Sequence, residues 1–511
     1  MENKIVEVTF SPKEAFDEEV FNQKILLYTK GKPFKILKRS IDARKVEVKV
    51  HFQIELVNDK ESKPDLWKPD FKPLTDDKRA IIIGFGPAGM FAAITCLENG
   101  IKPIILERGK DVRERRRDLA LLTKEMIVNE DSNYCFGEGG AGTYSDGKLY
   151  TRATKRGNVK RILEILHYHG AREEILYDAH PHIGTNKLPS VVTKIRETIE
   201  NGGGEVHFNL RVTDFKIEKN KIRGVVLANG ETVEGDHFIL ATGHSARDIY
   251  KLLNDKKIQI EAKPYALGVR IEHPQQVIDQ IQYHCIGERS EWLPASSYSL
   301  KHQASNNRGV FSFCMCPGGF IVPAATSPGE IVVNGMSPSK RNSFFANSGT
   351  VVTVDQRDFK KYEKYGSLAG MYFQQEVEQK ACQIAGNTQV APAQRLTDFM
   401  NNKISGSLPP TSYIPGLQSV DMKELLPEGI YTALKEGVKA FGKKMKGYYT
   451  EEAQLVGVES RTSAPVRIPR DNEKLHHPQI INLFPCGEGA GYAGGIVSAA
   501  IDGTRCADAL I

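Results

Sequence analysis

The pattern of apolar and polar positions predicts a strand, a turn and a helix near residue 80. Residues 79–83 are apolar and rich in isoleucine, which is the composition of a strand that is buried on both faces. The glycine-rich segment 84–89 follows at once, and residues 90–99 have a helical pattern. Residues 102–106 then predict a second apolar strand. This order of elements predicts a βαβ unit with a glycine turn at its first strand end.

Each residue type in the turn suits the binding of a dinucleotide. A glycine first allows the tight turn, a second lets the backbone approach a pyrophosphate, and a third lets the helix pack closely on the strand. The helix N-terminus offers free N–H groups to the phosphates. Glu107 ends the second strand 23 residues after Gly84, near the ~20 residues expected for a carboxylate that binds a ribose hydroxyl. The predicted contacts are Gly84, Gly86, Pro87, Ala88, Gly89, Glu107 and Arg108.

Two later segments indicate that the dinucleotide is FAD. A meander of short strands over residues 204–234 leads into an apolar strand at residues 238–240 and a small-residue turn. The C-terminal segment 480–495 predicts a strand that ends near an acid and a glycine-led helix. The acid can hold the ribityl chain, and the helix N-terminus can stabilise negative charge on a reduced flavin. The predicted contacts are Val212, Ala241, Thr242, Gly243, Gly487, Glu488, Gly494, Gly495 and Ile496.

A third segment, residues 136–148, is dense in glycine and has no periodicity. It is either a flexible surface loop or a backbone cradle for a ligand, and its place after the first βαβ unit favours the cradle. The predicted contacts there are Gly139, Gly140, Ala141, Gly142 and Lys148. The basic cluster at residues 113–117 is typical of a solvated helix face, but we expect Arg115 to reach the pyrophosphate.

These segments resemble the FAD-binding fold of the glutathione reductase type. The longer motifs FGEGGAGTYSDGKL, CMCPGG, NGMS, ESRTSAPVRIPRD and CGEGAGYAGGI are similar to those of a bacterial family of FAD-dependent dehydrogenases. The resemblance covers nearly the whole chain and implies non-covalent FAD, but it brings no settled substrate. Glu488 stands where an aspartate is commoner in the wider superfamily, and its longer arm still reaches a ribityl hydroxyl.

Composition narrows the class of protein. The chain has 511 residues, 40% of them hydrophobic and 26% charged, which is typical of a soluble globular protein. No apolar stretch approaches the ~18 residues of a membrane span, and the N-terminus has no signal-peptide pattern. Eight scattered cysteines suit a reducing cytoplasm, and no Cys or His spacing indicates a metal site. We therefore expect a cytoplasmic protein without a metal.

The chain divides into three predicted domains in an α/β fold. Residues 1–75 predict a small α+β module that ends in a proline-rich linker at residues 63–73. Residues 79–262 together with 451–511 predict a three-layer, Rossmann-like FAD-binding domain. Residues 263–450 predict an inserted α+β substrate or cap domain, with strands near residues 265–272, 309–314, 320–323 and 331–334 and helices near residues 368–385 and 430–442.

A carboxylate-bearing small molecule is the substrate that the arginines suggest. Arg461 and Arg467 precede the last FAD strand, and with Arg270 from the cap they would clamp an acid over the flavin for hydride transfer. The alternative is a structural salt bridge. Tyr492 is expected as a further polar contact beside the ring. No second glycine turn follows a strand, so NAD(P)H or another electron carrier is expected to bind only transiently.

Cys314 and Cys316 leave two interpretations open. They are either packing residues or a redox or nucleophilic pair on the substrate side, because a Cys-x-Cys disulfide loop is strained. Two other functions also remain open beside the FAD-dependent oxidoreductase. The net charge of +6 allows a flavin-dependent RNA-modifying protein, although few aromatic residues interleave with the basic clusters, and a non-catalytic flavin-binding scaffold is possible.

Overall fold

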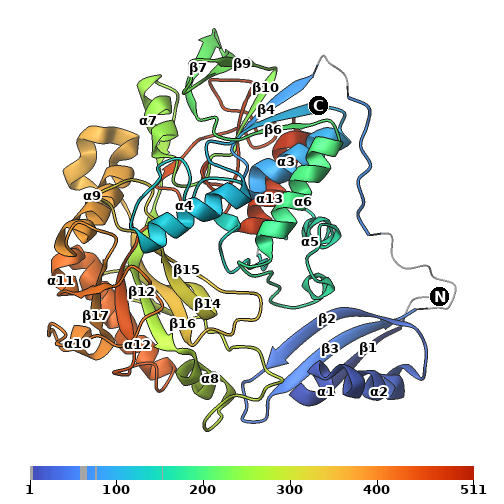
Figure 1. Ribbon diagram of the computed structural model, residues 1–511, viewed down its shortest axis with the longest axis vertical. Coiled ribbons are helices and arrows are strands. Elements are labelled where there is room, and N and C mark those ends of the chain that lie inside the picture. Colours follow the sequence, from blue (N-terminus) through green and yellow to red (C-terminus); the bar gives the residue numbers. More distant parts are fainter. Residues whose placement is uncertain (1–3, 58–65, 75–77, 152–153) are drawn as a thin grey trace.

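A five-stranded parallel sheet lies at the centre of the FAD-binding domain (Figure 1). This computed structural model describes residues 4–57, 66–74, 78–151 and 154–511. The strand order is β21, β10, β4, β5 and β6, and every neighbouring pair is parallel. Their bounds are β4 (Arg79–Ile83), β5 (Lys102–Leu106), β6 (Glu205–His207), β10 (His237–Leu240) and β21 (Leu483–Pro485).

The two faces of this sheet are covered by different layers. Ala80 and Ile82 point into a core with the helices, whereas Ile81 and Ile83 point into a core with an antiparallel three-stranded sheet. This alternation explains why the strand is apolar at every position. The helices are α3 (Pro87–Glu98), α5 (Val159–Tyr168), α6 (Leu188–Asn201) and α13 (Ile496–Asp508), and the small sheet is β7 (Val212–Glu218), β8 (Lys221–Leu227) and β9 (Thr232–Glu234). The predicted three-layer, Rossmann-like α/β class is confirmed.

The cap domain is a large twisted sheet with helices on its outer side (Figure 1). Its strands follow the order β13, β14, β16, β12, β19, β17 and β18, and β15 pairs with β14. They are β12 (Tyr265–Pro274), β13 (Lys301–Gln303), β14 (Gly309–Pro323), β15 (Val333–Met336), β16 (Phe345–Val354), β17 (Ala391–Arg395), β18 (Leu417–Ser419) and β19 (Gln454–Glu459). The helices are α8 (Gln275–Tyr283), α9 (Ala369–Ile384), α10 (Leu396–Met400), α11 (Met422–Leu425) and α12 (Glu428–Lys444).

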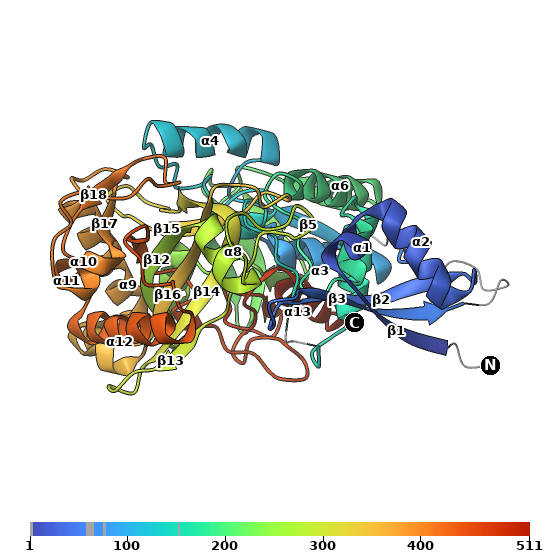
Figure 2. The ribbon, with the colours of Figure 1, turned by 90° about the horizontal axis from the view of Figure 1, so that it is seen from below.

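The remaining elements connect the domains or flank the glycine-rich loop. Helix α4 (Val112–Lys124) runs along one side of the molecule, as Figure 2 shows. Helix α7 (Arg247–Asp255) follows β10 and packs on β7. The chain enters the cap after β11 (Glu261–Ala262) and returns to the FAD-binding domain before β20 (Val466–Arg467). These two short strands pair with each other and are antiparallel.

The N-terminal module is an antiparallel sheet covered by two helices. It consists of β1 (Lys4–Phe10), α1 (Pro12–Phe16), α2 (Glu18–Thr29), β2 (Phe34–Asp42) and β3 (Lys49–Leu56), with β3 in the middle. The module contacts the FAD-binding domain through Arg39, whose guanidinium pairs with Asp178 at 2.7 Å. The predicted linker is only partly described, since residues 63–65 lie outside the described ranges. Its later part packs on the helical core through Trp67, Phe71 and Leu74 rather than standing free in solvent.

Three sequence expectations differ from the structure. Strand β6 joins the parallel sheet and is not part of the meander. Strand β19 lies in the cap sheet beside β12, so the chain returns to the FAD-binding domain after residue 459 and not near residue 451. Strand β16 was not predicted, because its first half, Phe-Ala-Asn-Ser-Gly, has the composition of a turn.

Candidate active site

One cavity of about 390 Å³ runs between the parallel sheet and the cap domain. The glycine turn after β4 forms one wall, the loop at residues 140–148 forms a second, and the start of α13 forms a third. The cap contributes residues from β14, β15 and the end of β19. Most predicted FAD contacts line this cavity: Gly84, Gly86, Pro87, Ala88, Glu107, Arg108, Gly140, Ala141, Gly142, Lys148, Val212, Ala241, Thr242, Gly243, Glu488, Gly494, Gly495 and Ile496.

The glycine turn is shaped by close backbone contacts. Gly84 has φ +100°, and a Cβ there would lie 2.5 Å from the carbonyl oxygen of Ala241. A Cβ on Gly89 would lie 2.1 Å from the carbonyl oxygen of Gly84, so this glycine packs the helix onto the turn, as predicted, without lining the cavity. Gly86 differs, because a Cβ there would have no protein atom nearer than 3.9 Å. Its open side faces the cavity, where a pyrophosphate needs close backbone approach.

Glu107 fixes the loops around the turn. Its carboxylate accepts hydrogen bonds from the backbone N–H groups of Phe85 at 2.8 Å, Gly109 at 2.9 Å and Gly137 at 2.9 Å. The side chain is buried and lines the cavity, so the same carboxylate is available to a ribose hydroxyl. The arrangement fits the adenosine half of FAD beside Glu107 and the pyrophosphate at the uncapped N-terminus of α3.

Arg115 does not line the cavity, in contrast to the prediction. Its buried guanidinium donates to the carbonyl oxygens of Asn133 at 2.8 Å, Glu138 at 2.8 Å and Gly140 at 2.9 Å. These bonds hold the glycine-rich loop against the turn, where a Cβ on Gly140 would lie 3.0 Å from the Cα of Gly86. The glycine-rich loop is therefore held in place by hydrogen bonds from Arg115, which lies outside the cavity. Gly139 and Gly487 also lie outside the cavity lining.

Glu488 and the start of α13 form the other end of the cavity. Burial raises the pKa of Glu488 to about 7, although Lys263 lowers it, and the charge on Cys314 raises it further. Glu488 of the FAD-binding domain and Cys314 of the cap both line the cavity. No side chain caps the N-terminus of α13, so its N–H groups can face the negative charge of a reduced flavin. This end fits the flavin ring.

The raised pKa of Glu488 makes stability depend on pH. Because the folded-state value lies above the unfolded value, the stabilisation from the protonated carboxyl is complete below about pH 4.5 and is lost as the pH rises through about 7. We expect Glu488→Gln to stabilise the FAD-free protein by about 1–3 kcal/mol at pH 8 and by little at pH 4.5. Melting temperatures of both proteins across this range check the prediction. An equal difference at every pH would contradict it.

The three arginines predicted to clamp a carboxylate do not converge. Arg270 is fully buried outside the cavity, where it pairs with Glu459 at 2.6 Å and donates to Asn347 at 2.6 Å. Arg467 is exposed and lies over the ring of Tyr492, with 4.9 Å between the guanidinium carbon and the ring centroid. Tyr492 also lies outside the cavity lining. Arg270, Arg467 and Tyr492 therefore do not meet at the cavity, and their catalytic roles stay predictions.

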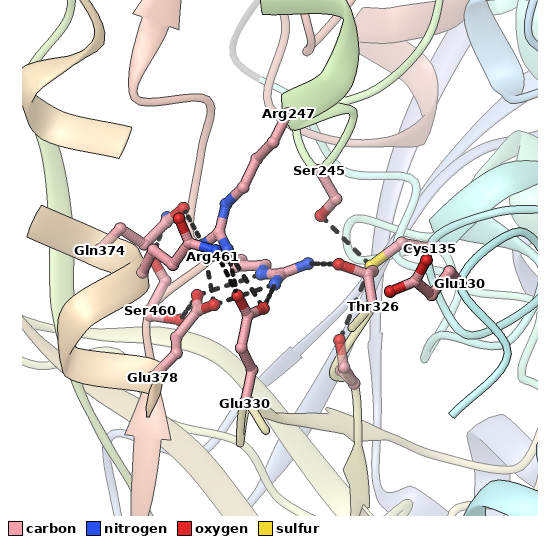
Figure 3. A network of polar contacts seen from close by, with 12 residues as sticks. Glu130, Cys135, Ser245, Arg247, Thr326, Glu330, Gln374, Glu378, Ser460 and Arg461 are labelled. Atoms are coloured by element: carbon pink, nitrogen blue, oxygen red, sulfur yellow. Dashed lines mark hydrogen bonds and ion pairs between the residues drawn. The ribbon is translucent and has the colours of Figure 1, made fainter. Parts of the chain in front are cut away.

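Arg461 lines the cavity but is held in a buried network (Figure 3). Its guanidinium bonds to Glu330 at 3.0 Å, to Glu378 at 2.9 Å and to the Thr326 hydroxyl at 2.6 Å. Arg247 pairs with the same two glutamates at 3.1 and 2.8 Å. Two arginines thus face two glutamates, so Arg461 carries little unpaired charge to offer a substrate. It is the structural salt bridge that the sequence left open as the alternative.

Several cavity residues were not recognised from the sequence as site residues. They include Cys135, Asp146, His244, Asn334, Cys314 and Glu459. The Cys-x-Cys spacing indicates Cys314, and Asp146, Asn334 and Glu459 lie in motifs that carry the family resemblance. Burial lowers the pKa of His244 to about 4, and Arg461 lowers it further, so its imidazole is neutral at pH 7. The other residues carry no local spacing signal.

Models of known protein families match three separate segments of the chain. A family model described as "FAD-dependent protein, C-terminal domain-like" matches residues 264–462, and one described as "Pyridine nucleotide-disulphide oxidoreductase" matches residues 78–267. A model for a domain of unknown function matches residues 2–57. A protein from Clostridium beijerinckii, named only as uncharacterized, is 42% identical over 495 residues, which cover 93% of this chain and 92% of the relative.

Solved structures with similarity to the chain are distant. CtdE in complex with FAD is 11% identical, with 85% of this chain and 84% of that chain covered and a TM-score of 0.30. A glycine oxidase from Bacillus cereus is 14% identical, with 84% and 94% covered and a TM-score of 0.30. Among the residues that the structure describes, no helix combines the length and the apolar character needed to cross a membrane.

Proposed function

The chain belongs to a bacterial family of FAD-dependent oxidoreductases, and from this premise we propose that it oxidises or reduces a small organic molecule by hydride transfer through non-covalent FAD. FAD is the cofactor of this family. The observation that carries the proposal is that one continuous cavity joins the FAD-binding turn to a cap surface lined by Phe313, Cys314 and Asn334. A substrate seated on that surface would lie against the ring end of the cofactor.

The residues of the chain bind and orient the cofactor, whereas FAD supplies the two-electron chemistry when bound. The turn at Gly86 and the N-terminus of α3 would hold the pyrophosphate, and Glu107 would hold the ribose. Glu488 would accept a hydrogen bond from the ribityl chain, and the N-terminus of α13 would stabilise negative charge. The cap sheet would cover the ring end and exclude water, which would strengthen each of these electrostatic contacts.

The cavity offers a substrate fewer charged contacts than the arginine clamp that the sequence predicted. Lys148 lines the cavity beside Cys314 of the cap, and its ammonium lies 3.5 Å from Asp146. Asp146 is also paired with Arg341 at 2.5 Å, and these two cations lower its pKa to about 2 despite burial. A carboxylate-bearing substrate remains our proposal for this end, now with Lys148 as its counter-ion in place of the arginines. NAD(P)H or another carrier would reach the ring only transiently.

Reoxidation of the reduced holoenzyme tests the proposal. The holoenzyme is reduced by light under argon and mixed with quinones, enones and 2-oxo acids in turn. We expect at least one class of oxidant to restore the oxidised flavin spectrum on the order of tenfold or more faster than it does for free reduced FAD, because the cap positions the oxidant. Rates equal to those of free flavin with every oxidant would indicate a flavin-binding scaffold instead.

A further inference from the structure

Two thiols meet two cations at the cap side of the cavity. The ammonium nitrogen of Lys148 lies 3.9 Å from the sulfur of Cys314 and 4.0 Å from the sulfur of Cys316. The guanidinium of Arg270 lies 3.9 Å from the sulfur of Cys316 and donates to the carbonyl oxygen of Cys314 at 3.2 Å. Cys314 lines the cavity, whereas Cys316 is fully buried behind it. The sulfur of Cys314 is therefore accessible to a ligand in the cavity, whereas the sulfur of Cys316 is not.

The strand is distorted where the two cysteines lie. The pairing of β14 with β16 shifts register between Phe313 and Cys316, and Cys314 has φ +43°, in the left-handed region that favours glycine. Such bulges re-aim side chains and occur next to active sites. The left-handed backbone of Cys314 costs conformational free energy. Packing alone does not explain this cost, because a regular strand would also bury two small apolar side chains.

The electrostatic surroundings favour a thiolate on Cys314. The Cys316 thiol donates to the backbone carbonyl oxygen of Cys314 at 3.2 Å. The neighbouring Cys316 side chain lowers the pKa of the Cys314 thiol well below its usual range, and Lys148 and Arg270 lower it further against the effect of burial. The Cys314 side chain and burial raise the pKa of Cys316 well above its usual range. Asp146 opposes the thiolate, but its own charge is shared with Lys148 and Arg341. These directions favour a thiolate on Cys314 beside a thiol on Cys316.

We propose that Cys314 and Cys316 form a dithiol–disulfide couple that exchanges two electrons with FAD in the cavity. The inference rests on the proposed function, since it needs the flavin ring at the cap end. In one direction of this exchange, the Cys314 thiolate and the Cys316 thiol lose two electrons and one proton, and a sulfur–sulfur bond forms between them. FAD gains the same two electrons and the proton, so no further reactant is needed.

The direction of exchange follows from the short loop. A Cys-x-Cys disulfide is strained, and strained disulfides have more oxidising potentials than relaxed ones. The reduced flavin is therefore able to return its electrons to the disulfide, and the thiolate and thiol are restored. All eight cysteines are free in the structure. The couple would store two electrons beside the ring and pass them to a substrate or carrier.

The test is a dark electron-transfer experiment on the holoenzyme. Wild type is oxidised with diamide, freed of reagent and shown by mass spectrometry to contain the Cys314–Cys316 disulfide. A light pulse under argon then bleaches the flavin, and the sample is kept in the dark. We expect the oxidised flavin absorbance to return as the disulfide takes up the electrons, and alkylation then finds both thiols free. Complete reduction should take about four electrons for each protein molecule.

Matched variants separate this role from packing. Cys314→Ser and Cys316→Ser keep the side-chain size, and both should stay bleached in the dark and take up about two electrons. Cys285→Ser, at a free cysteine outside the cavity, should behave as wild type. Absence of the disulfide after diamide treatment, or a disulfide that persists beside a bleached flavin, would overturn the inference. Both outcomes leave flavin reduction itself visible, so failure of the couple is distinct from failure of the oxidoreductase function.

Discussion

Gly86→Ala is expected to abolish FAD binding and to leave the fold intact. The backbone at Gly86 has φ −78° and ψ −175°, which alanine adopts freely, and the added Cβ would meet no protein atom within 3.9 Å. The methyl group would instead occupy the position where the backbone must approach the pyrophosphate. We expect the dissociation constant for FAD to rise by a factor on the order of a thousand, about 4 kcal/mol, because steric overlap is added to lost phosphate contacts.

Calorimetric titration of the FAD-free protein with FAD measures this change, and circular dichroism checks the fold. Gly89→Ala is the contrasting variant, since its Cβ would lie 2.1 Å from the Gly84 carbonyl oxygen. That variant should fail to fold properly, so it loses FAD for a different reason. A Gly86→Ala protein that binds FAD as wild type does would show that the pyrophosphate lies elsewhere.

Arg461→Ala is expected to destabilise the protein by about 3–5 kcal/mol at pH 8, because it leaves two buried carboxylates with one arginine in place of two. Glu330 and Glu378 would then share Arg247 alone. The pKa of Glu378 is lowered to about 2, since Arg247 and Arg461 outweigh the effect of burial. Without Arg461 that pKa rises toward or above its unfolded value, so the destabilisation should shrink as the pH falls from 8 to 5 and a carboxyl takes up a proton.

Unfolding in denaturant at the two pH values measures the change. Arg467→Ala is the matched control, because it removes a nearby exposed arginine whose guanidinium lies over the ring of Tyr492. Its effect on unfolding should stay within about 0.5 kcal/mol. An Arg461→Ala protein as stable as this control would show that the network in Figure 3 contributes nothing to the fold.

The sequence predicted the FAD-binding half of the chain well, because its signals are local. Strand β4 is apolar at both faces, the glycine turn follows it directly, and Glu107 comes at a fixed distance. Each of these features depends on neighbours in the sequence and on a backbone shape that only certain residues adopt. Gly84, with its positive φ, and Gly89, with its close contact, have the roles that their positions predicted.

The cap side of the cavity was predicted poorly, because its contacts join distant residues. Arg461 finds Glu378 and Glu330 at separations of 83 and 131 residues, which no spacing rule indicates. The arginines were interpreted from their charge alone, and partners that neutralise Arg270 and Arg461 could not be recognised. Lys148 and Cys314 are 166 residues apart and meet only in the folded chain. Sequence therefore located the residues with reactive side chains but not their neighbours.

The central claim is that FAD spans this cavity, with its ribose at Glu107 and its flavin ring against the cap. A crystal structure of the FAD-loaded protein tests it most directly. The claim predicts the pyrophosphate over Gly86, the ribityl chain within hydrogen-bonding distance of Glu488, and the ring in contact with Cys314. A flavin ring that lies away from the cap, with Glu488 and Cys314 contacting only protein or water, would contradict it.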